Sequence, residues 1–446
     1  MAFDRGGGES DLRRLSTRRR SEDSQGADMA SGQLAPSGRL GLYVHFPFCG
    51  VHCPYCDFAV DARADIPHDP YADAVIAEIG ARAGWFGWNA PGAATAARQS
   101  GLPPRLVSIY FGGGTPGLWR ADALARVITA GRQTLGNDEG AGIASASAPP
   151  IEITVEANPG EIDEPKLVEL RRAGVNRVSL GLQSLDDRLL RAIGRNHEAA
   201  AGPAAVRAAR SAGIDNVSVD LMFGLPGQSL DDWRRSVDGV LALNPDHVSA
   251  YALTIERGTP FGARARKGEL VVPDDEQTAL MQEWGRDALA AAGFMQYEVS
   301  STARPGKRAV HNGLYWIGAP YLGVGASAAS FRPLADGAGW RFSNPRATET
   351  YLRAARAGGG SPEPAQVERR TRADLENEAV WLALRTSDGL DRVAHAERFG
   401  IDPVSSRQAD VARCVDLGWL QVDALAVRPT PAGLLFADEI AVRLWL

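Results

Sequence analysis

The sequence predicts an α/β fold: a parallel sheet of the (βα)6 type, closed in part into a TIM-like barrel, followed by a small winged-helix-like domain. Two observations support this fold class. From Gly41 onward, β-rich runs alternate about six times with segments of helical period, which is typical of a parallel sheet with helices outside it. After a Gly-rich break at residues 357–364, the pattern changes to helices followed by a short hairpin.

Each strand is expected at a short run of β-branched and aromatic residues, and each helix in the segment that follows it. The expected strands are Leu42–Phe46, Leu106–Phe111, Ile151–Val155, Arg177–Leu180, Val217–Met222 and His247–Tyr251. The expected helices are Asp73–Ala83, Ala121–Thr134, Glu164–Ala173, Ala199–Ala212 and Asp231–Leu243. In a sheet of this type the active site lies at the carboxyl ends of the strands.

The chain is expected to divide into four regions. Residues 1–38, rich in Arg, Ser, Gly and Asp, form a disordered tail; residues 39–290 form the core barrel. Residues 291–360 are an extension that ends in a linker, and residues 361–446 are the C-terminal domain. That domain is expected to contain helices at Leu375–Arg385 and Arg392–Phe399, strand-like runs within Leu417–Pro431, and a final helix to Leu446. Two stretches of small residues, 89–100 and 136–150, are typical of flexible insertions.

Composition and charge limit the partners. The net charge is −6, and the C-terminal domain has no obvious basic recognition helix, so nucleic acid is disfavoured. No apolar run reaches membrane-spanning length, and the N-terminus lacks the apolar core of a secretory signal. Several acidic residues near the N-terminus argue against an organelle transit peptide. We therefore expect a cytoplasmic protein that does not bind nucleic acid; its oligomeric state is not indicated.

Three of the 4 cysteines, Cys49, Cys53 and Cys56, form a C-x3-C-x2-C motif directly after the first expected strand. In a reducing compartment such a group indicates metal binding rather than disulfides. The spacing lets three thiolates converge on a 4Fe–4S cluster, and three ligands for four irons leave one iron open. The fourth cysteine, Cys414, lies in an apolar helical stretch and is expected to be a small buried hydrophobe.

A structural zinc site is the alternative interpretation of the same motif, with His52 or His45 as the fourth ligand. The chain would then be a zinc-stabilised binding module. That interpretation leaves unexplained a glycine turn and several polar residues that follow later strands.

Residues able to hold a ligand follow four successive strands. The turn Gly112–Thr115 follows the second strand, where the absence of Cβ atoms lets backbone approach a ligand. Glu156 ends the third strand, Gln183 and Arg195 follow the fourth, and Asp220 lies in the fifth. A carboxylate at this end suits an ammonium or a ribose, and an arginine suits a carboxylate. Asp220, a charge in an apolar strand, must face the barrel interior and needs a partner there.

Six segments resemble one known family: YVHFPFC, CPYCDF, YFGGGTP, VEANP, GLQS and DLMFGLPGQ. They resemble the radical S-adenosylmethionine (SAM) group that contains the oxygen-independent coproporphyrinogen III oxidases and the HemW heme chaperones. The resemblance extends from about Gly41 to the C-terminus and implies a barrel of the radical SAM type. It also implies that the amino and carboxylate groups of SAM chelate the open iron. Reductive cleavage of SAM would then yield a 5′-deoxyadenosyl radical.

The same resemblance implies which residues contact SAM. Those expected at the cluster-bound SAM are Tyr43, Gly113 and Glu156. Those expected to line the neighbouring SAM-site region are Tyr55, Gly114, Thr115, Gln183, Arg195, Asp220 and Thr254, with Ala329 as one further contact.

Two features favour the chaperones over the oxidases. The oxidases have a further cysteine two residues after the third cluster cysteine, and a second SAM beside the first; here Phe58 occupies that position. The segment 311–316, HNGLYW, matches the H-N-x-x-Y-W motif that this family links with heme. Imidazole can ligate iron and aromatic rings can stack on a porphyrin, so the candidate heme residues are His311, Asn312, Tyr315 and Trp316. A buried, hydrogen-bonded histidine beside core aromatics is the alternative.

The resemblance thus implies a heme chaperone without coproporphyrinogen III dehydrogenase activity. It would hold a 4Fe–4S cluster, SAM and heme, and pass heme to acceptor proteins such as membrane-associated respiratory enzymes. An oxygen-independent coproporphyrinogen III oxidase of porphyrin biosynthesis is the first alternative, and the zinc-stabilised module is the second. Neither the acceptor, nor the heme ligands, nor the consumption of SAM is indicated.

Overall fold

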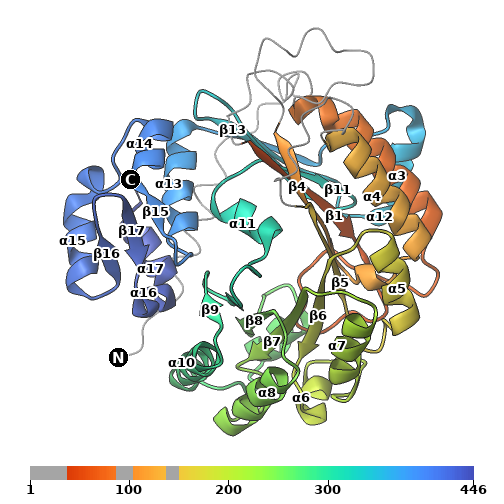
Figure 1. Ribbon diagram of the computed structural model, residues 1–446, viewed down its shortest axis with the longest axis horizontal. Coiled ribbons are helices and arrows are strands. Elements are labelled where there is room, and N and C mark those ends of the chain that lie inside the picture. Colours follow the sequence, from red (N-terminus) through yellow and green to blue (C-terminus); the bar gives the residue numbers. More distant parts are fainter. Residues whose placement is uncertain (1–37, 87–103, 137–149, 446) are drawn as a thin grey trace.

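The computed structural model describes residues 38–86, 104–136 and 150–445 (Figure 1). Their main feature is one 12-stranded sheet with the strand order β14-β13-β12-β11-β1-β4-β5-β6-β7-β8-β10-β9. The parallel strands are β1 (Arg39–Phe46), β4 (Arg105–Gly113), β5 (Glu152–Ala157), β6 (Arg177–Gln183), β7 (Val217–Phe223), β8 (His247–Ala252) and β11 (Tyr321–Val324). All six predicted strands are confirmed, in the parallel arrangement expected.

The extension after residue 291 continues this sheet at both edges. At one edge β11 pairs in parallel with β1, and the antiparallel strands β12 (Ala329–Pro333), β13 (Gly339–Ser343) and β14 (Gln366–Arg370) follow it. At the other edge, β10 (Ser301–Ala303) and β9 (Met295–Gln296) follow β8. No pairing joins β14 to β9 within the described ranges, so the barrel is partial, as expected.

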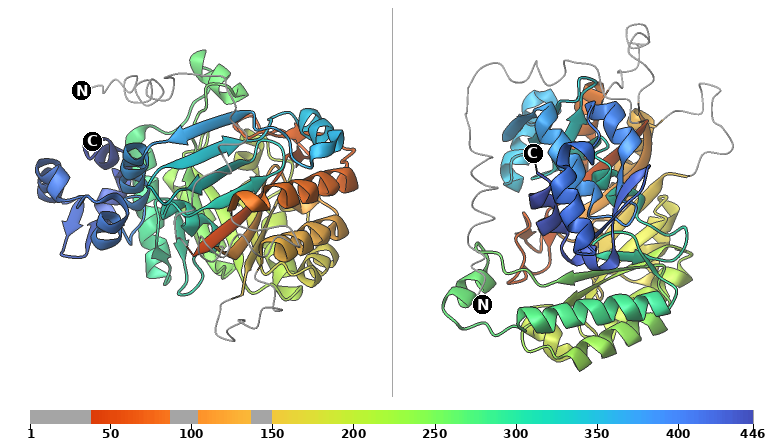
Figure 2. Two further views of the ribbon diagram at one scale, coloured as in Figure 1. Left: turned by 90° about the horizontal axis from the view of Figure 1, so that it is seen from above. Right: turned by 90° about the vertical axis from the view of Figure 1, so that its left-hand side faces the viewer.

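Helices cover the outer face of the parallel strands (Figures 1 and 2). They are α3 (His68–Arg82), α4 (Ala121–Leu135), α5 (Glu164–Arg172), α6 (Asp187–Ala192), α7 (Ala201–Ser211) and α8 (Leu230–Ala242). The five predicted helices correspond to α3, α4, α5, α7 and α8. Later helices are α9 (Pro260–Arg266), α10 (Asp275–Ala291), α11 (Val310–Trp316) and α12 (Thr348–Ala354). None of the helices in the described part of the chain is long and apolar enough to span a membrane.

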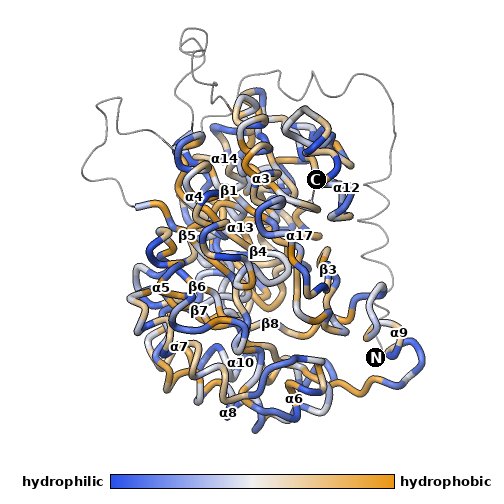
Figure 3. Tube along the Cα trace, turned by 90° about the vertical axis from the view of Figure 1, so that its right-hand side faces the viewer, coloured by the Kyte–Doolittle hydropathy of each residue, from blue (hydrophilic) through white to orange (hydrophobic). Residues whose placement is uncertain are grey.

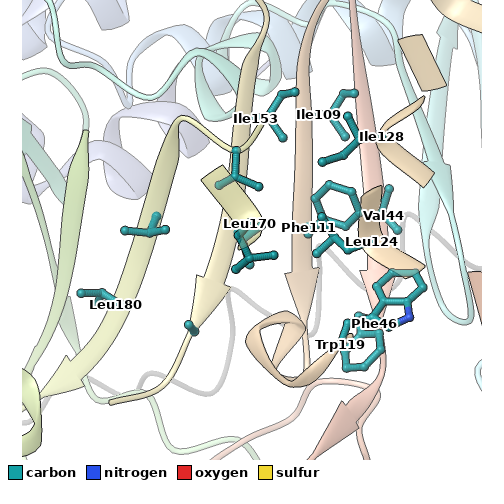
Figure 4. Close-up of a cluster of buried hydrophobic side chains, with 14 of the residues drawn as sticks. Val44, Phe46, Ile109, Phe111, Trp119, Leu124, Ile128, Ile153, Leu170 and Leu180 are labelled. Atoms are coloured by element: carbon teal, nitrogen blue, oxygen red, sulfur yellow. The ribbon is translucent and has the colours of Figure 1, made fainter. Parts of the chain in front are cut away.

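Hydrophobic residues in alternate strand positions form the core between sheet and helices (Figure 4). Val44, Phe111 and Ile153 come from three neighbouring strands and meet Leu124 of α4 and Leu170 of α5, all at most 1% exposed. Burial of one such side chain stabilises the fold by about 1.5–3 kcal/mol. In Figure 3 the hydrophobic segments follow the central strands, whereas α5, α7 and α8 alternate between polar and apolar residues. The strand positions that face away from the helices are not part of this core, so they can carry polar residues.

A buried ion pair fastens the extension to α3. Arg82 Nη1 lies 2.6 Å from Glu78 Oε1. The two residues are one turn apart on the helix, and neither side chain is exposed. Glu78 also accepts hydrogen bonds from Asn344 (2.8 Å), Tyr351 (2.7 Å) and the backbone N–H of Gly325 (2.9 Å). These partners satisfy a buried carboxylate that would otherwise be costly. Residues from three parts of the extension thus converge on one pair in α3.

The C-terminal residues form a separate unit with its own core. It contains α13 (Arg372–Ala383), β15 (Leu390–Asp391), α14 (Arg392–Phe399), α15 (Gln408–Asp416), β16 (Leu420–Val422), β17 (Ala426–Pro429), α16 (Pro431–Leu435) and α17 (Ala437–Arg443). The three strands form a small antiparallel sheet. Cys414, fully buried in this core, is the small hydrophobe that was expected.

The sequence-based domain boundaries can be compared with these elements only in part. The main sheet continues through β14, beyond the stretch 357–364 that was interpreted as a linker, so we propose that the C-terminal unit begins near residue 371. The predicted disordered tail, apart from Gly38, lies outside the described residues. So do the predicted insertion at 89–100 and most of that at 136–150.

Candidate functional site

A cavity of about 400 Å³ lies at the carboxyl ends of the parallel strands, next to the cysteine loop. Strand alternation explains its polar lining: Ile109, Val155 and Leu180 face the helices, so their neighbours Tyr110 and Glu156 face inward. The lining residues are Cys49, Val51, His52, Cys53, Tyr55, Cys56, Phe58, Val60, Gly113, Gly114, Thr115, Glu156, Ala157, Asn158, Glu161, Ser179, Gly181, Gln183, Arg195, Asn196, Asp220, Met222 and Tyr251.

The three cysteines of the motif all line this cavity as free thiols. The hydroxyl of Thr115 donates to Cys49 Sγ at 3.5 Å, and Arg195 Nη1 lies 3.9 Å from Cys53 Sγ. Burial raises the pKa of Cys49 to about 11 and also raises the pKa of Cys56. Thiolates here therefore need a compensating cation, which the irons of a cluster would supply.

Of the two histidines that could complete a zinc site, His45 has both ring nitrogens hydrogen-bonded and His52 has one. His45 has one ring nitrogen 3.0 Å from the Tyr43 hydroxyl and the other 3.1 Å from the carbonyl of Ala59. His52 Nε2 lies 3.2 Å from the carbonyl of Cys56. Across the described residues, no three His, Cys, Asp or Glu side chains converge on a single-ion position. A cubane instead spreads its thiolates over separate irons, so the donor set fits a 4Fe–4S cluster better than zinc.

The glycine turn after β4 is shaped by close backbone packing. Gly113 has φ of +113°, and a Cβ there would lie 2.6 Å from the ring of His45. A Cβ on Gly114 would lie 2.6 Å from the carbonyl oxygen of Phe48. The N–H groups of Gly114 and Thr115 donate to the cysteine-loop carbonyls of Phe46 and Phe48 at 2.7 and 2.8 Å. Only glycine fits, because the turn holds the cysteine loop against the sheet.

Glu156 is a buried carboxylate held from two sides. Tyr110 donates its hydroxyl proton to Glu156 Oε1 at 2.6 Å, and the Gly113 N–H donates to Oε2 at 3.2 Å. Burial raises the pKa of Glu156 to about 7, helped by the nearby charge of Asp220 and opposed by the hydrogen bond from Tyr110. The carboxylate would therefore gain from a cationic ligand group in the cavity.

Arg195 and Asp220 form another part of the cavity wall. Arg195 donates to the side chain of Asn158 and, at 3.0 Å, to the carbonyl of Gly181, while its buried Nε has no hydrogen-bond partner among the described residues. Asp220 accepts from the Ser179 hydroxyl at 3.2 Å, which is the partner that its position in an apolar strand required. Burial raises the pKa of Asp220. This wall thus offers an unsatisfied donor and a carboxylate to a polar ligand.

Most of the residues predicted for SAM meet in this cavity. Those that line it are Tyr55, Gly113, Gly114, Thr115, Glu156, Gln183, Arg195 and Asp220. Those that do not are Tyr43, Thr254 and Ala329. Tyr43 lies behind the lining, with its hydroxyl on His45, and Thr254 is an exposed residue beyond β8. Gln183 has φ of +62°, an uncommon backbone conformation for a residue other than glycine and one often found at functional sites.

Sequence reasoning missed two tyrosines at the site. Tyr251 lines the cavity at the end of β8 and is 42% exposed. Tyr110 orients Glu156. Both lie on strands that were predicted. Tyr110 alternates with the buried Ile109 and Phe111, so the period of 2 could have identified it, whereas the exposed end of β8 gave no such signal for Tyr251.

The HNxxYW segment forms α11, and its histidine is enclosed in the core. His311 is 1% exposed, with Nδ1 2.8 Å from the Ser108 hydroxyl and Nε2 2.9 Å from the Tyr315 hydroxyl. Its ring stacks on Tyr110, with the ring centroids 5.0 Å apart. Ligation of heme iron by His311 would require one of these hydrogen bonds to break. The alternative of a buried, hydrogen-bonded histidine thus describes His311 in this structure.

The other residues of the motif differ in their surroundings. Asn312 and Trp316 are half-buried, and neither Asn312 nor Trp316 lines the cysteine cavity. Trp316 instead lines a second cleft, between α11 and the C-terminal unit, and Tyr315 lines a further small pocket beside it. Figure 1 shows α11 between the main sheet and the C-terminal unit.

Comparison with known proteins gives consistent family matches. The model of the radical SAM superfamily matches residues 43–239, and that of the HemN C-terminal domain matches residues 371–436. The heme chaperone HemW of Escherichia coli is 36% identical over 67% of this chain and 71% of its own length. HemW of Synechocystis is 34% identical over 78% of both chains. The mitochondrial radical S-adenosyl methionine domain-containing protein 1 of Mus musculus is 33% identical over 92% of this chain and 88% of its own.

Among solved structures, the coproporphyrinogen III oxidase HemN from Escherichia coli, a radical SAM enzyme, superposes with a TM-score of 0.73. It covers 95% of this chain and 94% of its own at 22% identity, which shows that the two share a fold.

Proposed function

This chain belongs to the HemW-like family of the radical SAM superfamily, and from that membership we propose that it is a heme chaperone. It would bind heme beside a domain that carries a 4Fe–4S cluster and SAM, and release the heme to acceptor proteins. The observation that carries the proposal is the position of α11. On one side the HNxxYW helix stacks His311 on Tyr110, which hydrogen-bonds the cavity-lining Glu156, and on the other it forms part of a separate cleft.

Cys49, Cys53 and Cys56 are the proposed cluster ligands, and the polar lining of the cavity is the proposed SAM site. When bound, the cluster and SAM together supply one-electron chemistry that can generate an adenosyl radical. Glu156 would accept hydrogen bonds from an ammonium or ribose of the ligand, and Arg195 would donate to a carboxylate. The Gly112–Gly114 turn lets backbone approach the ligand without Cβ obstruction.

A chain of contacts joins this site to α11. Glu156 accepts from Tyr110, whose ring stacks on His311, and His311 is hydrogen-bonded to Tyr315. We propose that His311 positions α11 rather than ligating iron, and that the exposed side of the motif, including Trp316, faces the heme. Asn312 and Tyr315 would support that surface. A conformational change at the SAM site would then be transmitted to the heme site through these contacting side chains.

We propose that the acceptors are respiratory enzymes at the membrane and that the chain works in the cytoplasm. Free cluster cysteines fit a reducing compartment. The coproporphyrinogen III oxidase alternative has less support, since Phe58, which is 67% exposed in the cavity wall, stands where the oxidases have a cysteine.

Anaerobic purification, followed by heme titration and transfer, tests the proposal. The cluster-loaded chain should take up about one equivalent of heme, seen as a shifted Soret band, and should lose it to an apo-hemoprotein mixed in excess. Absence of heme uptake by the cluster-loaded chain would overturn the chaperone assignment.

A further inference from the structure

A second cleft, of about 300 Å³, lies between α11 and the C-terminal unit. None of its lining residues is shared with the cysteine cavity. Its walls come from α11, α13 and α14, and include Trp316, Ile317, Ala383, Leu390 and Phe399. Ile317 is 59% exposed, so the cleft has an apolar mouth. A cleft with these walls suits a flat, largely apolar ligand.

Two residues of this lining each have a buried polar atom with no hydrogen-bond partner among the described residues. The two atoms are Nδ1 of His395 and Nε1 of Trp316. The side chain of His395 is only 1% exposed. Buried polar groups in folded proteins are nearly always paired, so these two atoms are the groups of the lining that a ligand would pair. One is a ring nitrogen that can ligate a metal, and the other can only donate a hydrogen bond.

The second nitrogen of His395 is fixed by a buried carboxylate. His395 Nε2 lies 2.9 Å from Glu376 Oε1, and Arg407 donates to the other oxygen of Glu376 at 2.7 Å. A carboxylate only accepts, so in the neutral imidazole Nε2 carries the proton and Nδ1 keeps its lone pair. Metal-ligating histidines are commonly oriented in this way, with the free nitrogen on the metal and the other on a carboxylate.

The cleft also offers positive charge. Arg398 lines it with its guanidinium near the Phe399 ring, and it forms no ion pair with any residue that the structure describes. Arg308, at the other side of the lining, is paired with Asp388 at 2.6 Å. An unpaired guanidinium at the edge of an apolar cleft suits a ligand with a peripheral carboxylate.

We propose that this cleft is the heme site, with His395 Nδ1 as an axial ligand of the iron. The indole N–H of Trp316 and the guanidinium of Arg398 would bind the propionate carboxylates, and the apolar walls would contact the macrocycle. The inference rests on the proposed function and deepens it by naming the ligand. Heme satisfies all three groups at once: it has an open axial position, peripheral carboxylates and a flat apolar ring.

The decisive variant is His395→Gln in the full-length, cluster-loaded chain. The glutamine amide can still donate to Glu376, so the buried contact stays while the imidazole is lost. We expect heme affinity to fall by about tenfold or more, and affinity for metal-free protoporphyrin to change by less than about twofold. Trp316→Phe and Arg398→Gln should weaken both ligands, because they remove contacts to the propionates. His68→Gln, at the start of α3 and away from both cavities, is the matched control.

Resonance Raman spectra of the ferrous heme complex give a readout that a purely structural role would not move. The iron–histidine band of the wild-type chain should be absent in His395→Gln and retained in His68→Gln. If His395→Gln does not load the cluster or fold, Trp316→Phe and Arg398→Gln still decide whether heme lies in this cleft. Unchanged heme affinity in both would overturn the proposed site.

The outcomes separate this inference from the proposed function. Should the wild-type chain bind heme while His395→Gln keeps its affinity and its iron–histidine band, the ligand assignment is wrong and the chaperone function stands. Should His311→Gln alone lose the band, His311 is the ligand. Should the wild-type chain bind no heme, the proposed function itself fails.

Discussion

His311 and Tyr315, one helical turn apart in the HNxxYW motif, are joined by a 2.9 Å contact between the imidazole Nε2 and the phenol hydroxyl. Ser108 lies 2.8 Å from the other ring nitrogen. The backbone N–H groups of Val310 and His311 also donate to the carboxylate of Glu152 at 3.0 Å. The start of α11 is therefore anchored to β4 and β5. The motif has an inner, structural side and an outer side at the cleft.

This anchoring makes stability depend on pH. Burial, and secondly the charge of Arg177, lowers the pKa of His311 to about 3. In the unfolded chain the pKa of a histidine is about 6.5, so below that pH the unfolded state binds a proton that the folded state does not. The contribution of the buried, neutral His311 to the unfolding free energy is fully present above about pH 6.5 and is lost as the pH falls toward 3. Between pH 7 and pH 5, His311 should account for about 2 kcal/mol of lost unfolding free energy.

Urea unfolding of the wild-type chain and of His311→Gln at both pH values measures that contribution. The variant should be less stable at pH 7 and less sensitive to pH. Some dependence should persist, because burial lowers the pKa of His247 as well. An equal pH dependence in the two proteins would contradict the buried, neutral state of His311.

Cluster ligation by three cysteines predicts a sharp difference between them and the fourth. Serine at Cys49, Cys53 or Cys56 should remove most iron and sulfide from anaerobically purified protein, since each thiolate holds a separate iron. Cys414→Ser should keep full content, because Cys414 lies buried in the C-terminal core. Iron and sulfide assays with absorption spectra decide this, and a full complement in Cys53→Ser would exclude it as a ligand.

Glu156 should control SAM affinity. Loss of its charged hydrogen bond in Glu156→Ala should weaken binding roughly ten- to a hundredfold, equivalent to about 1.5–3 kcal/mol. Since the pKa of Glu156 is raised to about 7, affinity should also fall as the pH is lowered through 7, where the carboxylate takes up a proton. Calorimetry at several pH values measures both effects. In Glu156→Gln the pH dependence should disappear, whereas Glu164→Ala at the start of α5 should behave as wild type.

The ion pair between Glu78 and Arg82 should contribute more to stability than any exposed pair. Glu78→Ala leaves a buried guanidinium without its carboxylate and frees Asn344 and Tyr351, so unfolding free energy should fall by about 3–5 kcal/mol. The matched control is Asp122→Ala, which removes an exposed partner of Arg120 and should change stability by less than about 1 kcal/mol. Chemical denaturation of both variants gives the comparison. A loss below about 1 kcal/mol for Glu78→Ala would mean that the extension is not held through this pair.

The alternation of strands and helices was readable in the sequence because each element buries one face. Strands with apolar residues at every second position and helices of period 3.6 identified the parallel half of the sheet. The other half was not identified. Its strands are short. β11 pairs with β1 and β10 with β8, both far away along the chain, which no local pattern reports.

The site shows the same division. Polar residues at the ends of apolar strands predicted the cavity, since parallel strands bring their carboxyl ends together. The surroundings of His311 were not predictable, because its partner Ser108 is 203 residues away along the chain. His395 could not be identified from the sequence, where it is one histidine in an amphipathic helix. Only the structure shows that it lines a cleft with Trp316 and that its Nδ1 has no partner among the described residues.

The last prediction is that the chain takes up heme but does not oxidise coproporphyrinogen III. The reason lies at Phe58, which projects into the cysteine cavity with 67% of its surface exposed. A phenyl ring can neither ligate metal nor hydrogen-bond a second SAM, and the related oxidases have a cysteine there. A reaction that removes two carboxyl groups through two radical events should therefore fail.

An anaerobic assay with coproporphyrinogen III, SAM and a reductant tests this, with a coproporphyrinogen III oxidase as the positive control. Wild-type protein with a full cluster should form no protoporphyrinogen, yet bind heme in a parallel titration. Phe58→Ala should behave in the same way, because the ring is not needed for the cluster thiols or for the cleft at His395. Catalytic formation of protoporphyrinogen by the wild-type chain would contradict the prediction and favour the oxidase. Coproporphyrinogen III has more carboxyl groups than heme and no metal, so a heme carrier is not expected to convert it.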